Sequence, residues 1–239
     1  MTASRALVII GGGPAGITAA IEAARAGLSP TLIDEAPALG GQVYRHLPEA
    51  FQVDDVHGLG QDFARGERLH QELADVAGRV EFLSNTAVLG MWPNREILWT
   101  RGEGSGVLKA ERLIIASGAF DRPMPFPGWT LPGVMTAGGV QTILKTMRVR
   151  PGRRALVAGT GPLILAVACR LHQAGIEIAS VLEAGDPPWR DGVFPKEWAH
   201  ADLINDSREH LAYLRKESIA VRTNHTWRNR CQFYFRRQN

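Results

Sequence analysis

The sequence predicts an α/β protein built from two strand–helix–strand units, with an antiparallel meander inserted after the first. Two glycine-rich loops, at residues 11–16 and 159–164, carry this prediction. Each follows a short apolar, β-rich run and opens onto a helical pattern. Three short β-rich runs between the loops predict the meander. A chain of 239 residues with 45% hydrophobic content is long enough and apolar enough to bury such a core.

The first loop has the G-x-G-x-x-G spacing of a dinucleotide-binding turn. Gly11 allows a tight turn out of the strand, Gly13 lets a diphosphate approach the backbone, and Gly16 lets the helix pack closely on the strand. Pro14 and Ala15 begin the helix, whose free N–H groups and positive end favour the phosphates, and Gly27 stands where the helix should end.

An acidic pair follows the second strand of this unit, which is predicted at residues 31–33. Asp34 follows Gly11 by 23 positions, close to the spacing expected for an acid on a ribose hydroxyl, and Glu35 stands beside it. A Gly-Gly pair then precedes Gln42, so that Gly41 allows a second close approach of the backbone to the cofactor. An NAD-only domain has no need of this second element, which therefore favours FAD.

The pattern of apolar residues in the rest of the first unit predicts a helix, a short strand, the meander and a further strand. The predicted ranges are 65–77 for the helix, 80–83 for the strand, 87–92, 96–100 and 106–109 for the meander, and 111–115 for a buried strand. That last strand runs into the small residues Ala116, Ser117 and Gly118, which leave room for a ligand at the sheet edge.

A proline-rich connector over residues 120–132 leads to a helix over 136–147 capped by Thr136, and then to the second unit. Gly159 and Gly161 repeat the first two loop glycines, and Glu183 repeats the acid, but Ile164 occupies the third glycine position. A branched side chain there should separate helix from strand or change the loop. A bound NAD(P) or other nucleotide and a vestigial structural repeat therefore both stay open.

Composition excludes several other classes of function. No apolar stretch is long enough to cross a bilayer, and the N-terminus does not read as a signal peptide. Cys169 and Cys231 form no redox or metal motif, which favours a reducing compartment such as the cytoplasm. His46, His57 and His70 lie in no triad or metal-ligand pattern, and no nucleic-acid motif accompanies the basic residues at 222–239. Residues 226–239 fit either a natural basic extension or a foreign tail from a truncated or frame-shifted reading.

Residues 11–16, 32–35, 40–45 and 116–118 together resemble the FAD elements of flavoproteins that have two dinucleotide-binding domains. The segment 119–134 and the loop 159–163 narrow the resemblance to the FAD-binding A or α subunit of opine oxidases, hydroxyproline dehydrogenases and hydrogen cyanide synthase. It covers residues 5–225, corresponding to the front half of such a subunit. It implies an FAD domain at 1–120, an NAD(P)-binding-like domain at 121–225, a basic tail at 226–239, and Val88 near the adenine.

The resemblance further implies an FAD-dependent oxidoreductase component, and the sequence singles out no catalytic acid or base in it. Its partner would be a flavoprotein subunit carrying the amine-oxidising site, in a hetero-oligomer without nucleic acid, metal or a transmembrane segment. Two alternatives remain at this stage: a stand-alone NAD(P)H-dependent flavin reductase of the thioredoxin-reductase type, and a non-catalytic nucleotide-binding fragment. The absent C-x-x-C motif and Ile164 count against the reductase.

Overall fold

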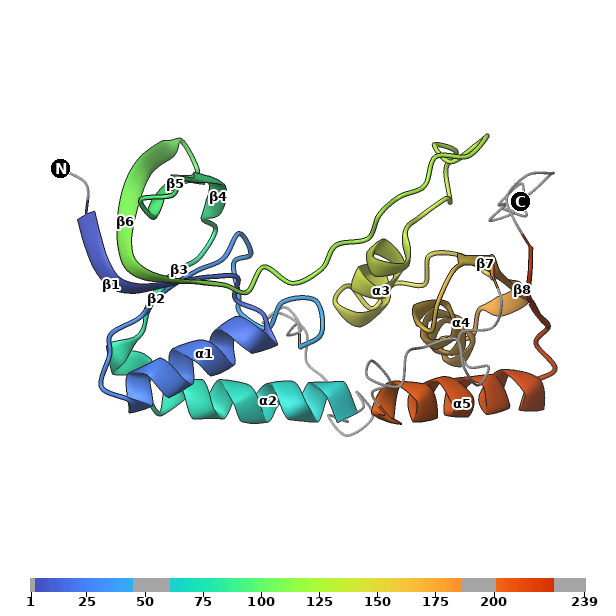
Figure 1. The fold of residues 1–239 in the computed structure, drawn as a ribbon. Coiled ribbons are helices and arrows are strands. Elements are labelled where there is room, and N and C mark those ends of the chain that lie inside the picture. The colour runs from blue at the N-terminus through green and yellow to red at the C-terminus, as the bar shows by residue number, and fades with distance from the viewer. Residues whose placement is uncertain (1–2, 45–60, 186–200, 226–239) are drawn as a thin grey trace. The chain divides into compact units, whose positions relative to one another are not determined.

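The computed structural model describes residues 3–44, 61–185 and 201–225, which form two compact units, residues 1–120 and 121–239 (Figure 1). Unit 1 contains a six-stranded sheet in the order β3-β2-β1-β6-β5-β4. Its strands are β1 (Ala3–Ile10), β2 (Thr31–Ile33), β3 (Glu81–Leu83), β4 (Ala87–Met91), β5 (Glu96–Arg101) and β6 (Gly104–Ile115). Its helices are α1 (Pro14–Arg25) and α2 (Gln61–Ala74), followed by the 3-10 turn η2 (Ala77–Arg79).

The predicted α/β class and its βαβ-plus-meander order are confirmed, but β6 differs from the prediction. One continuous strand replaces the two predicted at 106–109 and 111–115. Its first half pairs antiparallel with β5 and its second half parallel with β1. In the described residues the second half has no partner beyond β1, so Ile115 is 60% exposed and the prediction of a buried strand was wrong there.

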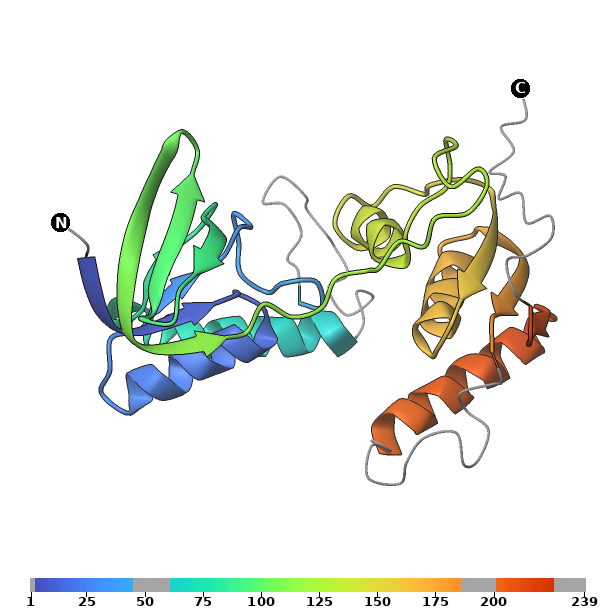
Figure 2. The same ribbon diagram turned by 45° about the horizontal axis from the view of Figure 1, so that its top comes forward.

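Alternating residues of β1 pack into two separate clusters on the two faces of the sheet. Leu7 and Ile9 face the helical side, where they join Ala20 of α1 and Leu32 of β2. Val8 faces the other side and packs with Ile97 and Leu108 of the meander strands. Ile9, Ala20, Leu32 and Val8 are fully buried, and burial of an aliphatic side chain of this size contributes about 1.5–3 kcal/mol. Figures 1 and 2 show α1 and α2 side by side below the sheet.

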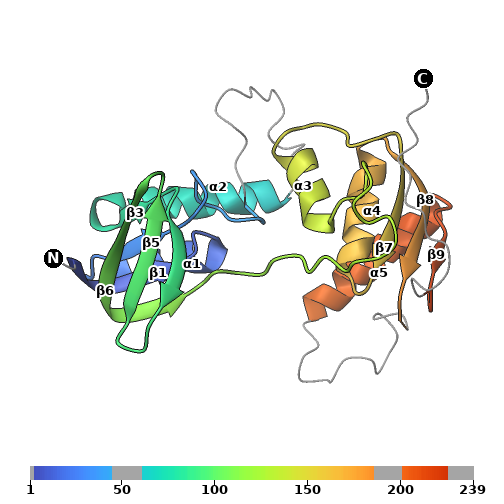
Figure 3. The same ribbon diagram turned by 90° about the horizontal axis from the view of Figure 1, so that it is seen from above.

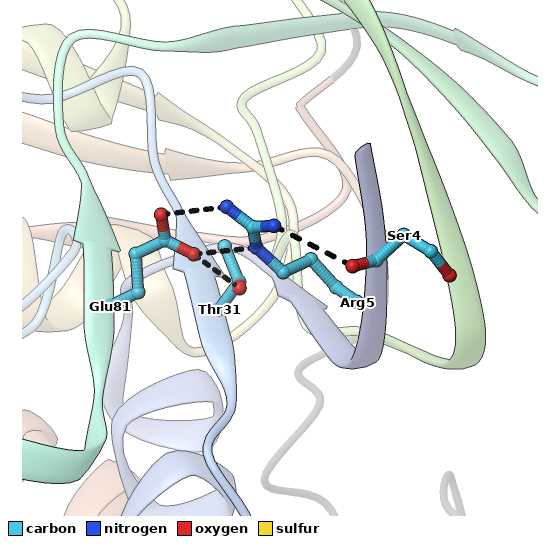
Figure 4. Close-up of polar contacts among 4 residues, drawn as sticks. All are labelled: Ser4, Arg5, Thr31 and Glu81. Carbon is cyan, nitrogen blue, oxygen red and sulfur yellow. Dashed lines mark hydrogen bonds and ion pairs between the residues drawn. The ribbon is translucent and has the colours of Figure 1, made fainter. Parts of the chain in front are cut away.

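A polar cluster ties together the three parallel strands at the end of the sheet opposite the glycine loop (Figure 4). Arg5 of β1 donates two hydrogen bonds to the carboxylate of Glu81, at 2.8 and 3.0 Å. Thr31, the first residue of β2, donates a third at 2.8 Å. The Arg5 guanidinium, mainly through these hydrogen bonds, holds the pKa of Glu81 below its usual value.

Unit 2 contains a parallel three-stranded sheet in the order β7-β8-β9 (Figure 3). The strands are β7 (Arg154–Gly159), β8 (Glu177–Glu183) and β9 (Val221–Arg222), and the helices are α3 (Ala137–Lys145), α4 (Leu163–Gln173) and α5 (Ala201–Lys216). Their apolar faces form one core that includes Val140, Leu165, Val181 and Leu214. The predicted cap is confirmed, since the Thr136 hydroxyl accepts from the Gly139 N–H at 3.2 Å. The predicted tail lies outside the described residues.

Candidate dinucleotide-binding site

The turn from β1 into α1 requires glycine at two of its positions for reasons internal to the protein. Gly11 has a φ of +106°, and a Cβ on it would lie 2.3 Å from the carbonyl oxygen of Ala116. A Cβ on Gly16 would lie 1.8 Å from the carbonyl oxygen of Gly11. The two glycines therefore bring α1 against the ends of β1 and β6, as the loop spacing predicted.

Gly13 is different, because nothing in the protein requires it to be glycine. Its φ of −76° and ψ of −176° suit any residue. A Cβ at this position would meet only the Cα of Gly41, at an ordinary contact distance of 3.9 Å. The open backbone at Gly13 lies at the N-cap of α1. A glycine that packing does not demand, at a helix N-terminus, fits the close approach of a phosphate group.

The first turn of α1 is suited to an anion. Pro14 stands at its start, no acidic residue lies in this turn, and no side chain caps the helix. The first N–H groups of a helix have no intrahelical partner, and they carry the positive end of the helix dipole, about half an elementary charge. Ala15 is exposed beside them. This turn can therefore donate hydrogen bonds to a diphosphate.

Asp34 anchors the glycine loop with its carboxylate. One oxygen, Oδ2, accepts from the Gly12 N–H, and Oδ1 accepts from the Ala36 N–H at 2.7 Å. The backbone carbonyl of Asp34 accepts from the Thr86 N–H at 2.9 Å, which fixes the start of β4 beside it. A carboxylate has about four acceptor sites, so these two bonds leave capacity for a ribose hydroxyl. The ribose role of Asp34 stays a prediction.

The loop after β2 passes close to the glycine loop. The Gly40 N–H donates to the Gly12 carbonyl at 2.8 Å. Gly41 has a φ of +58°, and a Cβ on it would lie 2.8 Å from the Cα of Gly13. Gln42 is exposed, and its Nε2 lies 3.5 Å from the Ala119 carbonyl. The Gly-Gly pair thus lets the second loop lie directly against the first.

The remaining predicted site residues lie on β4, on the segment after β6 and on the loop after β2. The Ala116 N–H donates to the Ile10 carbonyl at 2.7 Å, and Gly118 has a φ of +71°. Ser117 and Glu35 are exposed. Val88 packs partly buried against the cluster on the meander side of the sheet. Their contacts with a cofactor stay predictions.

Sequence reasoning missed the importance of Gly12 and Leu39. A Cβ on Gly12 would lie 2.5 Å from the Leu39 side chain and 3.0 Å from the Asp34 carboxylate, so Gly12 is required as well. The motif treats this position as variable. The signal that could have found it was the run of three consecutive glycines, Gly11 to Gly13.

The second glycine loop has a different geometry. Helix α4 begins at Leu163, four residues after Gly159, whereas α1 begins three residues after Gly11. A Cβ on Gly159 would lie 2.9 Å from the Ile164 side chain, and the left-handed residue is Gly161, with a φ of +91°. Ile164 has therefore changed the loop, which was one of the two predicted outcomes.

Glu183 is fully buried at the end of β8, and its carboxylate binds the backbone of this second loop. Its carboxylate accepts from the Gly161 N–H at 2.9 Å and from the Gly185 N–H at 3.2 Å. These bonds compensate for the burial of the carboxylate. Glu183 thus repeats the bracing role that Asp34 has in the first unit.

The family assignment follows from a match of residues 5–228 to the Pyridine nucleotide-disulphide oxidoreductase family. The chain belongs to this family. It is 40% identical over 222 residues to the hydrogen cyanide synthase subunit HcnB of Pseudomonas protegens, a match that covers 90% of this chain and 46% of the relative. It is 35% identical over 195 residues to the A subunit of opine oxidase from Agrobacterium tumefaciens, covering 78% of this chain and 38% of the relative. The chain spans less than half the length of these curated relatives.

Solved structures of oxidoreductases share the fold of this family member. L-proline dehydrogenase from P. horikoshii superposes with a TM-score of 0.62 at 26% identity, over 76% of this chain and 36% of that one. A NAD-dependent persulfide reductase from A. fulgidus gives a TM-score of 0.61 at 23% identity, over 92% and 40% of the two chains. The predicted fold class and the predicted relationship to opine oxidase and hydrogen cyanide synthase subunits are confirmed.

The family relationship supports a flavin cofactor. The two curated relatives are named as subunits. Within the described ranges, no helix is long and apolar enough to cross a membrane. The same ranges contain no cluster of histidine, cysteine or acidic side chains that could hold a metal ion.

Proposed function

We propose that this chain forms the FAD-binding unit of an electron-transferring subunit in an amino-acid-derivative dehydrogenase complex. The observation that carries the proposal is the open backbone at Gly13, at a helix N-terminus and between two glycine loops that pack against each other. The relatives supply the class of reaction. They include the A subunit of an opine oxidase and the alpha subunit of a sarcosine oxidase, the latter 30% identical over 191 residues.

The residues of unit 1 are suited to the ADP half of FAD. Gly13 and the first turn of α1 would receive the diphosphate, and Asp34 with Glu35 would bind the ribose. Gly41 and Gln42 would lie over the diphosphate from the other side, because Gly41 packs directly on Gly13. Val88 would lie near the adenine, and the segment 116–118 would border the remainder of the cofactor.

Bound FAD supplies two-electron redox chemistry, and the protein supplies its position and surroundings. We propose that a partner flavoprotein subunit carries the amine-oxidising site, and that the two form a hetero-oligomer. The subunit names of the relatives support this arrangement.

The altered loop of unit 2 supports a structural role there rather than the binding of NAD(P). Glu183 is fully buried, whereas Asp34 is partly exposed, and Ile164 fills the space next to Gly159. This arrangement favours electron input from a partner subunit over direct reduction by NAD(P)H.

The test is anaerobic reduction of the FAD-reconstituted chain, followed through the flavin absorbance. The proposal predicts reduction by an opine, sarcosine or proline only when the partner subunit is present. It also predicts no direct reduction by NADH or NADPH. Rapid bleaching of the flavin by NAD(P)H alone would contradict it and favour a stand-alone flavin reductase. A folded chain that retains no flavin would favour a non-catalytic nucleotide-binding fragment.

A further inference from the structure

Unit 1 has a second hollow, on the helical side of the sheet, that shares only the first turn of α1 with the dinucleotide site. This α1–α2 hollow has a volume of about 450 Å³ and lies between the first half of α1 and residues 65–72 of α2. Besides the first turn of α1, its lining includes Thr18, Tyr44, Arg65, Arg68, Leu69 and Glu72. Gly11, Gly13, Gly16 and Asp34 do not line it. A volume of this size is within the range of small-molecule sites.

Two arginines dominate the charge of the hollow. Arg65 and Arg68 are three residues apart on α2 and so lie on the same face of that helix. Across the described parts of the chain, neither guanidinium has a hydrogen bond or an ion pair. Two neighbouring guanidinium groups without an acidic partner repel each other, and an anion placed between them would relieve this repulsion.

The other lining groups suit a phosphate group rather than a flat apolar ligand. Thr18 and Tyr44 contribute hydroxyl groups, which donate hydrogen bonds to anionic oxygens. The first turn of α1 lines the hollow, so the positive end of the α1 dipole faces it. The one acid of the lining, Glu72, is paired with Arg25 at 3.1 Å. Arg25, which is shared with Glu22, partly offsets its charge.

We propose that the α1–α2 hollow binds a small phosphate monoester, with Arg65 and Arg68 as its main phosphate ligands. Arginine binds phosphate with two parallel N–H donors, and two arginines one turn apart provide two such forks. Leu69 offers an apolar surface for the rest of the ligand. The proposal does not depend on the proposed redox function, because the two sites share only the first turn of α1.

The test is isothermal titration of the full chain, at low salt, with inorganic phosphate and with glycerol 3-phosphate. We expect saturable binding of both by the wild-type chain, with glycerol 3-phosphate the tighter. The double substitution R65A/R68A should weaken it at least about tenfold, since it removes charge-assisted hydrogen bonds. The matched control is R101A, because Arg101 is an exposed arginine at the end of β5 and outside the hollow. It should leave binding unchanged.

Three results would overturn the proposal: no saturable binding by the wild-type chain, equal weakening by R101A, or tighter binding of an acidic peptide than of glycerol 3-phosphate. Repeating the titration with saturating FAD separates the two sites. Suppose that saturating FAD abolishes phosphate binding by the wild-type chain, and that the R65A/R68A variant still binds phosphate without FAD. The phosphate then occupies the dinucleotide site, and the proposal is wrong. Measurement of FAD binding on the same variants shows independently whether the proposed function fails.

Discussion

Substitution of Gly13 by alanine should separate cofactor binding from folding. The added Cβ would meet only the Cα of Gly41, at 3.9 Å, and the backbone angles of Gly13 suit alanine. Alanine is a poorer N-cap than glycine, but it also reduces the entropy of the unfolded chain. The two effects oppose each other. We therefore expect the free energy of unfolding to change by less than about 1 kcal/mol.

The same methyl group should strongly reduce affinity for FAD. It would stand where the diphosphate approaches the first N–H groups of α1, and would force the phosphate away from them. Loss of one charge-assisted hydrogen bond costs about 1.5–3 kcal/mol, which corresponds to a weakening of about 10- to 150-fold.

The assay is a flavin fluorescence titration of G13A and the wild-type chain, with urea unfolding of both. The matched control is G78A, since a Cβ on Gly78 has no atom within 4 Å and Gly78 lies outside the left-handed region. G78A should bind FAD as the wild-type chain does. Wild-type affinity in a folded G13A would refute the placement of the diphosphate, and an unfolded G13A would refute the packing argument.

Three further predictions concern stability and reactivity. Because Arg5 lowers the pKa of Glu81, the stability that Glu81 contributes is present above its unfolded pKa and is lost as the pH falls through the folded value. E81Q should therefore be less stable than wild type at pH 7, by no more than about 1 kcal/mol for this exposed pair, and the difference in urea midpoint should vanish in acid. Burial raises the pKa of the Cys169 thiol to about 11. In a C231S background, iodoacetamide should thus label Cys169 at pH 8 at least about a hundredfold more slowly than in the urea-unfolded chain, and equal rates would show an accessible thiolate. Ile164 is 5% exposed in the core of unit 2, so I164A should cost about 2–5 kcal/mol in thermal or urea unfolding, and a loss below about 1 kcal/mol would show that the loop does not depend on it.

The sequence was sufficient to predict the elements in which the apolar periodicity agrees with the residues that start and stop a helix or strand. Helix α1 was expected with Pro14 in its first turn and Gly27 after its end, and the structure places it at Pro14–Arg25. Strand β2 was predicted at its observed bounds. Local signals decide these elements, because the proline, the glycine and the apolar spacing all favour the same structure.

The elements that depend on distant pairing were predicted less well. The break expected between residues 109 and 111 is absent, because β6 exchanges one partner strand for another without interrupting its backbone. The helix predicted over 136–147 ends at Lys145, so Met147 lies beyond the end of α3 and is 53% exposed. Such outcomes depend on which strand or helix lies alongside, and periodicity within one segment does not contain that information.

Within the candidate site, the sequence indicated which glycines matter but not what each one contacts. A Cβ on Gly11 would clash with Ala116, and a Cβ on Gly16 would clash with Gly11, so both positions require glycine. At Gly13 no contact within the protein requires glycine. The additional bond from the Gly12 N–H to Asp34 could not be predicted, because a carboxylate at this position is expected to face the ribose.

The most direct test of an FAD site in unit 1 is a titration of the wild-type chain with FAD, followed by gel filtration with absorbance at the protein and flavin wavelengths. We predict saturable binding of one FAD per chain and a flavin absorbance that elutes with the folded protein. Cooperative unfolding of the same sample, together with no flavin in the protein peak and no saturation in the titration, would contradict the proposed site.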